Sequence, residues 1–211
     1  MNFDAILLVV LGLCLTGTYF FARTLLKADN SFFYRNGRAM RGWDILFAID
    51  RKKFDRRLQD LSIETIPFFR KWIFYDIRFA PVFHIAVAIL LYFAKKAYAQ
   101  PGFQLFFDVL IVSQGLSLIS HIITDIMLMS SLKHLEMQDS MALFNFNVII
   151  KMLFPMIGCF VSFATLVLVW FRFLDAHGLA MATLLFMVPP VLIIVIVKLA
   201  KAIKPKVVLS K

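Results

Sequence analysis

The chain has 211 residues, of which 61% are hydrophobic, and its mean hydropathy is +0.82. Soluble domains are roughly 45–50% apolar, so this composition excludes an ordinary water-soluble domain and indicates a membrane protein. The net charge of +10 does not indicate nucleic-acid binding, because the cations lie between and after the apolar runs, as in the cytoplasmic loops of membrane proteins.

Five apolar runs predict an all-α, polytopic membrane bundle of about five transmembrane helices. A straight span requires about 20 residues, and the runs cover residues 3–22, 79–94, 105–130, 143–171 and 179–197. An alternative start of the second run lies near Ile73. The first run is expected to be a retained span, because Asp4 lies at its start and Arg23 follows it, the reverse of the charge order of a secretory signal. The expected organisation is a first transmembrane helix over 1–22, a basic cytoplasmic segment over 23–78, and a bundle of about four helices with a short basic tail over 79–211.

The basic residues predict the orientation of the chain. Residues 23–78 contain 13 Lys and Arg against 7 Asp and Glu, and five lysines follow Val197. Placing both regions in the cytoplasm requires an odd number of spans with the N-terminus outside. Four spans are the alternative and would separate the two basic regions. We expect an integral protein of a bacterial inner membrane, in contact with anionic headgroups.

The basic segment is expected to contain an amphipathic helix followed by an interfacial stretch. In the first part, apolar side chains share roughly one helical face, although Asp50 interrupts it: Trp43, Leu46, Phe47, Phe54, Leu58 and Leu61. Over 66–79 aromatic residues alternate with cations, a mixture typical of the headgroup layer. These residues predict either a lipid or partner docking site or a plain interfacial anchor: Trp43, Phe68, Phe69, Arg70, Lys71, Trp72 and Tyr75.

The third run carries a polar stripe. At 100° per residue, Ser113, Ser117, Ser120 and Thr124 fall within about 60° of one another, and Gln114, His121 and Asp125 extend the stripe on one side. Unsatisfied polar groups in hydrocarbon cost several kcal/mol each. This helix is therefore predicted to turn its stripe into the protein, with the other spans packed around it.

Four ionisable residues within the runs are predicted to meet in the inner leaflet: His84, His121, Asp125 and Lys151. His121 and Asp125 are four residues apart on one helix face, and Lys151 is the expected counter-charge of Asp125. The hypothesis is an Asp125–Lys151 ion pair with His121 hydrogen-bonded to Asp125. In the alternative, Lys151 extends to the headgroups and each histidine is satisfied separately.

Small residues and prolines mark helix contacts and breaks. The fourth run has a face that includes Gly158 and Ser162 and permits close helix approach. Pro155 should kink its helix, and Pro189 with Pro190 should interrupt the last one. The only two cysteines, Cys14 and Cys159, lie within apolar runs and are expected to be packing residues.

No nucleophile elbow, phosphate-binding loop or paired catalytic carboxylates occur in the sequence, so neither an enzyme nor a cofactor is expected. A metal site at His84, His121 and Asp125, or a haem between the two histidines, are alternatives. The first expectation is a non-enzymatic subunit or assembly factor of a larger membrane complex, with protein partners in the membrane. A small transporter or proton-conducting protein using residues 113–125 is the second. A membrane-embedded lipid-modifying enzyme is the third.

Overall fold

The computed structural model describes residues 3–98 and 101–173. Residues up to 166 form one compact unit. The named elements are all helices: α1 (Phe3–Asp29), α2 (Gly42–Leu46), α3 (Arg51–Gln59), α4 (Thr65–Ala97), α5 (Pro101–His134) and α6 (Met141–Phe173). The apolar run 179–197, with its two prolines, and the basic tail lie outside the described residues.

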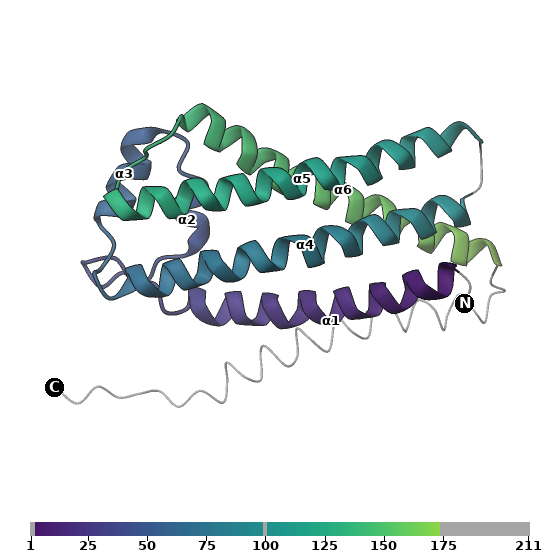
Figure 1. The fold of residues 1–211 in the computed structure, drawn as a ribbon, viewed down its shortest axis with the longest axis horizontal. Coiled ribbons are helices and arrows are strands. Elements are labelled where there is room, and N and C mark those ends of the chain that lie inside the picture. Colours follow the sequence, from purple (N-terminus) through teal and green to yellow (C-terminus); the bar gives the residue numbers. More distant parts are fainter. Residues whose placement is uncertain (1–2, 99–100, 174–211) are drawn as a thin grey trace. The chain divides into compact units, whose positions relative to one another are not determined.

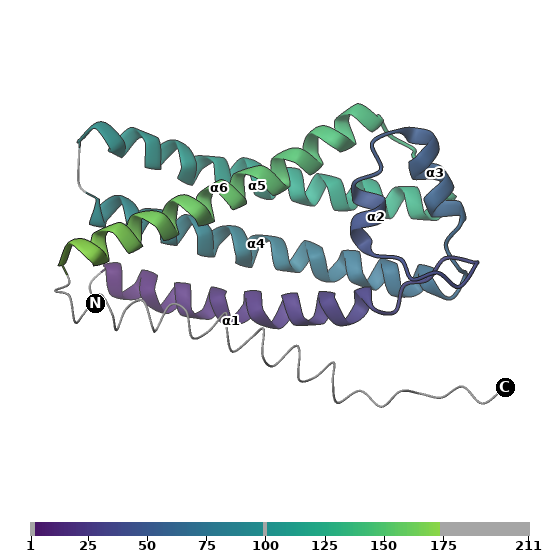
Figure 2. The same cartoon turned by 180° about the vertical axis from the view of Figure 1, so that it is seen from behind.

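Four described helices, α1, α4, α5 and α6 as far as Val167, are long and apolar enough to cross a membrane. Successive long helices run in opposite directions, and α1 packs on α4, which packs on α5 (Figure 1). The last of them, α6, crosses α4 and α5 obliquely (Figure 2). The prediction of an all-α membrane-helix bundle is therefore confirmed.

The long helices extend beyond the apolar runs that predicted them. Helix α1 continues to Asp29 and α4 begins at Thr65, so residues 23–29 and 65–78 of the expected basic segment are helical and continuous with the first two apolar runs. Hydropathy detects only the part of a helix that is apolar on all sides, whereas the first turns of α4 are two-sided. There Phe69 and Trp72 are buried while Arg70 and Lys71 are exposed.

Helix α5 is polar inside and apolar outside. Every polar residue of its stripe is buried, and the opposite face exposes a row of aliphatic and aromatic side chains: Leu105, Phe106, Val109, Val112, Leu116, Ile119 and Ile126. In water this arrangement would be unstable, but in a bilayer it gives each face a matching environment. The burial of this stripe was the central expectation from the sequence, and the structure agrees with it.

Residues 30–64 form a cap over one end of the bundle. The expected single amphipathic helix is wrong, because the chain forms two short helices, α2 and α3, separated at Asp50. The carboxylate of Asp50 accepts the backbone N–H of Lys53 at 2.8 Å, which is the interaction of an N-terminal helix cap. Asp50, which interrupted the apolar face in the sequence, is thus the residue that starts α3.

The cap has an apolar core of its own that is continuous with the helix ends. The Phe54 ring lies 5.2 Å from that of Phe144 of α6, edge to face. Asp55 accepts the backbone N–H of Met137 at 2.6 Å, and Arg51 donates to the Met137 carbonyl at 2.9 Å, which ties α3 to the loop between α5 and α6. The cap is therefore a folded part of the bundle.

Two apolar clusters enclose a polar layer along the bundle. The cluster at the cap end includes Leu128 of α5 and Val148 of α6. The cluster at the far end is formed mainly by Val87, Leu91, Ala94, Phe107 and Leu110 of α4 and α5. The buried charged side chains lie between the two clusters along the helices.

Candidate functional site

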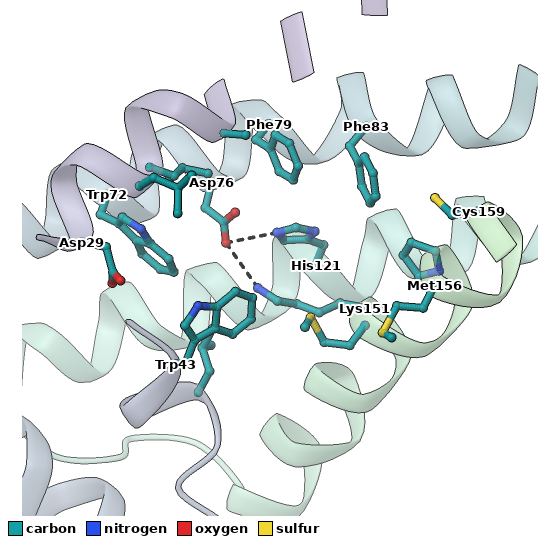
Figure 3. Close-up of a pocket in the computed structure, with 16 residues that line it drawn as sticks. Asp29, Trp43, Trp72, Asp76, Phe79, Phe83, His121, Lys151, Met156 and Cys159 are labelled. Atoms are coloured by element: carbon teal, nitrogen blue, oxygen red, sulfur yellow. Dashed lines mark hydrogen bonds and ion pairs between the residues drawn. The ribbon is translucent and has the colours of Figure 1, made fainter. Parts of the chain in front are cut away.

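Three helices contribute to a buried charged cluster, which we define as Asp76 of α4, His121 and Asp125 of α5, and Lys151 of α6. Lys151 Nζ lies 3.1 Å from Asp125 Oδ1 and 3.4 Å from Asp76 Oδ2. His121 Nε2 lies 3.1 Å from the same Asp76 oxygen, an ion-pair contact without hydrogen-bond angles. None of the four side chains is more than 10% exposed. Figure 3 shows Asp76 between His121 and Lys151.

The structure brings together the four ionisable residues singled out in the sequence. The Asp125–Lys151 ion pair is present, and Lys151 is only 4% exposed, so its ammonium does not extend to the headgroups. The expected hydrogen bond from His121 to Asp125 is wrong: these side chains are 3.8 Å apart, and Asp76 is nearer to His121. The His84 ring lies 5.7 Å from the His121 ring, edge to face.

Sequence reasoning missed Asp76. Its aromatic and basic surroundings were attributed to the headgroup layer, although it is the only acidic residue between 65 and 79. The available signal was helical spacing, because Asp76 precedes His84 by eight residues, about two turns of one helix. The alternative start of the second run near Ile73 places both residues in the same helix.

The polar stripe of α5 is used mainly for packing. Ser113 and Thr124 donate to carbonyls of their own helix, Leu110 and Ser120 respectively. Two cross-helix bonds join α5 to α6: the Ser117 hydroxyl donates to the Ile150 carbonyl at 3.1 Å, and the Gln114 amide donates to the Phe154 carbonyl at 3.1 Å.

Gly158 allows the close approach of these helices. A Cβ added there would lie 2.7 Å from Val87 Cγ1 and 2.8 Å from Gln114 Nε2. Ser162, on the same side of α6, is buried and donates to the Gly158 carbonyl. The small-residue face expected to bind other helices is therefore filled from within this chain.

Two residues of the expected interfacial dock are core residues. Phe69 is fully buried and Trp72 is 6% exposed, and their rings stack with centroids 5.6 Å apart. Phe68 and Trp43 are about half exposed, Arg70 and Lys71 are exposed, and Tyr75 is half-buried. A docking surface in this region would have to be built from the exposed members of the set.

The charges of the cluster do not balance. It contains two carboxylates and one ammonium, so with a neutral His121 it carries one surplus negative charge. Asp125 Oδ2 and His121 Nδ1 are buried without hydrogen-bond partners, whereas buried polar atoms in proteins nearly always have them. One bound proton or one small cation would balance the charge.

A metal ion is the less suitable of these two. Donor atoms of Asp76, His121 and Asp125 lie within 4.8 Å of one another, and this donor set is chemically suited to a divalent metal. The Lys151 ammonium, however, already contacts both carboxylates. A metal would repel it, so metal binding requires Lys151 to lose its proton or move away, whereas a proton requires neither.

A cavity of about 440 Å³ adjoins the cluster. Three residues of the cluster, Asp76, His121 and Lys151, line this cavity, and so does Asp29 of α1. Aromatic rings contribute from the cap and from α4: Trp43, Trp72, Phe79 and Phe83. In Figure 3 the rings of Phe79 and Phe83 project from α4 toward the cavity in which His121 and Lys151 lie.

Comparison with known proteins adds no further assignment, since no family model, no curated protein and no solved structure matches the chain. The fold and the apolar helices define its class: an α-helical polytopic membrane protein.

Proposed function

We propose that this protein is a small membrane transporter that binds and releases a proton at the charged cluster. The observation that supports the proposal is the uneven charge of the cluster, which places two carboxylates against one ammonium inside the membrane-spanning bundle. Ionisable groups at such a depth are costly and typically serve ion or substrate pathways. A proton on a carboxylate or on His121 makes the cluster electrically neutral.

The polar residues beyond the cluster extend in one direction along the interface of α4 and α5. His84 follows His121, and Gln114 lies 3.4 Å from His84 Nδ1. Beyond Gln114 the apolar cluster around Leu91 and Phe107 separates these groups from the far end. A site closed on that side suits a transporter that must change conformation before it releases an ion there.

A subunit or assembly role is less well supported by the geometry. It was expected from the small size of the chain, the absence of catalytic motifs, the small-residue helix faces and the interfacial segment. Of these, the small-residue face of α6 is contacted at Gly158 by Val87 and Gln114 of the same chain. An enzymatic role has no nucleophile arranged beside a base among the described residues. For the orientation, we propose that the basic cap end lies in the cytoplasm.

Charge displacement in vesicles tests the transporter proposal. Vesicles containing the protein, adsorbed on a solid-supported membrane, should give a current after a pH jump, because protons entering a buried site move charge across part of the bilayer. Asp125→Asn and Asp76→Asn should each abolish this current, since either one leaves a balanced carboxylate–ammonium pair. Asp108→Asn is the matched control, because Asp108 lies in the same helix, is half exposed and pairs with Lys95.

A wild-type current no larger than that of empty vesicles would refute the proposal, as would an unchanged current in both cluster variants. Purification in mild detergent addresses the subunit role separately. Stoichiometric partner chains together with an absent current would favour that role.

A further inference from the structure

We propose that the cavity beside the charged cluster binds a lipophilic organic cation, of the protonated arylalkylamine or quaternary ammonium class, in exchange for the cluster proton. The inference rests on the proposed function and extends it by naming the substrate class. Three properties of the cavity support it: the charge of its carboxylates, its apolar and aromatic lining, and the unpaired ring nitrogen of His121.

The residues that line the cavity favour a lipophilic ligand that binds to aromatic rings. A cavity of about 440 Å³ is in the range of small-molecule sites. Its walls are mostly apolar, with Met152, Pro155 and Met156 from α6 and with aromatic rings from α2 and α4. Aromatic rings attract cations through their electron-rich faces, most strongly where water is excluded.

The charge selects a cation over an anion or a phospholipid headgroup. Two carboxylates, Asp29 and Asp76, line the cavity, and Lys151 is the only cation among the described residues that do so. Lys151 is also the partner of Asp125 behind the cavity, at 3.1 Å. A phosphate entering here would be repelled by the surplus carboxylate, whereas a monovalent cation would neutralise it.

Asp76 and His121 provide the polar groups that a ligand in the cavity would contact. Asp76 lines the cavity and receives both of its close ionic contacts at one oxygen, Oδ2. His121 is only 6% exposed, and its Nδ1 has no hydrogen-bond partner. The N–H group of a protonated amine could donate to this nitrogen.

Cation and proton should compete for the same surplus charge. The titratable groups around this charge are Asp29 of α1, Asp76 and His84 of α4, His121 and Asp125 of α5, and Lys151 and Cys159 of α6. This competition fixes the direction in which cation affinity changes with pH. Protonation removes the negative charge that holds the cation, so cation affinity falls as the pH falls, by up to about tenfold per pH unit for one-for-one exchange.

Tetraphenylphosphonium and tetraphenylborate provide the test, because they share size and shape and have opposite charge. Equilibrium dialysis against the purified full chain in neutral detergent micelles, with protein-free micelles subtracted, measures binding of each. We expect saturable tetraphenylphosphonium binding at one site per chain, at least about tenfold tighter than tetraphenylborate binding and accompanied by proton release. The tryptophans that line the cavity, Trp43 and Trp72, supply a second readout by fluorescence quenching.

Variants assign the binding to the cavity. Asp76→Asn should abolish both binding and proton release, and Asp108→Asn should change neither. Ala22→Trp places a large ring in the cavity from α1 without altering a charge. It should block cation binding and leave the pH-jump current of the cluster in place, which separates loss of the site from failure to fold.

Equal binding of the two ions would overturn the inference and indicate a cavity for neutral lipid chains. Unchanged tetraphenylphosphonium affinity in Asp76→Asn, or an affinity independent of pH, would also overturn it. The proposed proton binding is measured without any organic cation. A current that persists while tetraphenylphosphonium fails to bind therefore rejects this inference alone.

Discussion

Replacement of Lys151 by methionine should be the most destabilising single change in the charged cluster. Methionine keeps most of the side-chain volume, so the loss is mainly electrostatic. The ammonium contacts two buried carboxylates, Asp125 at 3.1 Å and Asp76 at 3.4 Å, and its removal leaves both without a cationic partner other than a protonated His121. Removing one partner of a buried ion pair typically costs about 3–5 kcal/mol, and we expect Lys151→Met to lie in this range.

Asp125→Asn should behave differently because the cluster carries a surplus carboxylate. After this change Asp76 and Lys151 remain as a balanced pair, so the free energy of unfolding should change by no more than about 1 kcal/mol, the usual scale of one neutral hydrogen bond. A simple one-to-one ion pair would lose similar stability from either partner. Equal destabilisation by Lys151→Met and Asp125→Asn would therefore refute the reasoning that the cluster is uneven.

The Lys95–Asp108 pair is the matched control for these measurements. Its atoms are closer, at 2.6 Å, but its side chains are 26% and 51% exposed. Exposed pairs contribute about 0.2–1 kcal/mol, so Lys95→Met should cost far less than Lys151→Met in spite of the shorter distance. Equilibrium unfolding by SDS titration in mixed micelles, followed by tryptophan fluorescence, measures all of these variants on one scale.

Three further predictions concern packing, the cap and the loop beneath it. Gly158→Ala should destabilise the bundle by about 1–3 kcal/mol because it overpacks the α4–α5–α6 contact, whereas Gly115→Ala, with open space around its Cα, should be neutral or stabilising in the same SDS titration. The Lys53 backbone N–H holds the pKa of Asp50 below its usual value of 3.8. The stability difference between wild type and Asp50→Ala should therefore be complete above that value and shrink as the pH falls through the lowered pKa, as thermal unfolding at a series of pH values will measure. Asp55→Ala should accelerate hydrogen exchange at the Met137 amide, and unchanged exchange there would show that this amide is protected by another group.

The helix class and the central ion pair could be predicted from the sequence because both follow from strong local signals. A polar stripe at helical spacing inside an apolar run has one low-energy solution, burial against protein. Once the stripe is buried, Asp125 needs a cation at the same depth, and Lys151 is the only lysine or arginine within the inner part of the next run. The depth of a residue in a membrane follows from its position along its helix, so the sequence alone indicates which residues of neighbouring spans lie at the same level. For this reason the Asp125–Lys151 pair could be predicted.

The features that were not predicted depend on side-chain contacts that the position of a residue along its helix does not indicate. Asp76 lies in a half-buried part of α4, where hydropathy resembles that of a headgroup anchor and only the buried face distinguishes it. The cap residues carry charges that suggested a surface segment, but Phe54 and Leu58 are buried through their packing against helix ends far away in sequence. Tertiary contacts between distant segments decided both cases.

A purely architectural role for the cluster is difficult to reconcile with its composition. Replacing a buried ion pair by apolar residues of similar volume is often neutral or even stabilising, so four ionisable groups are an inefficient way to hold helices together. Besides the Lys151–Asp125 contact, the bonds from Ser117 and Gln114 of α5 to backbone carbonyls of α6 join these helices with neutral groups. An architectural cluster would also be expected to balance its charges and pair its atoms, whereas this one has a surplus carboxylate and an unpartnered imidazole nitrogen beside a cavity. These features support the proposed binding role, and Asp125→Asn and Asp76→Asn should keep the fold while losing the current.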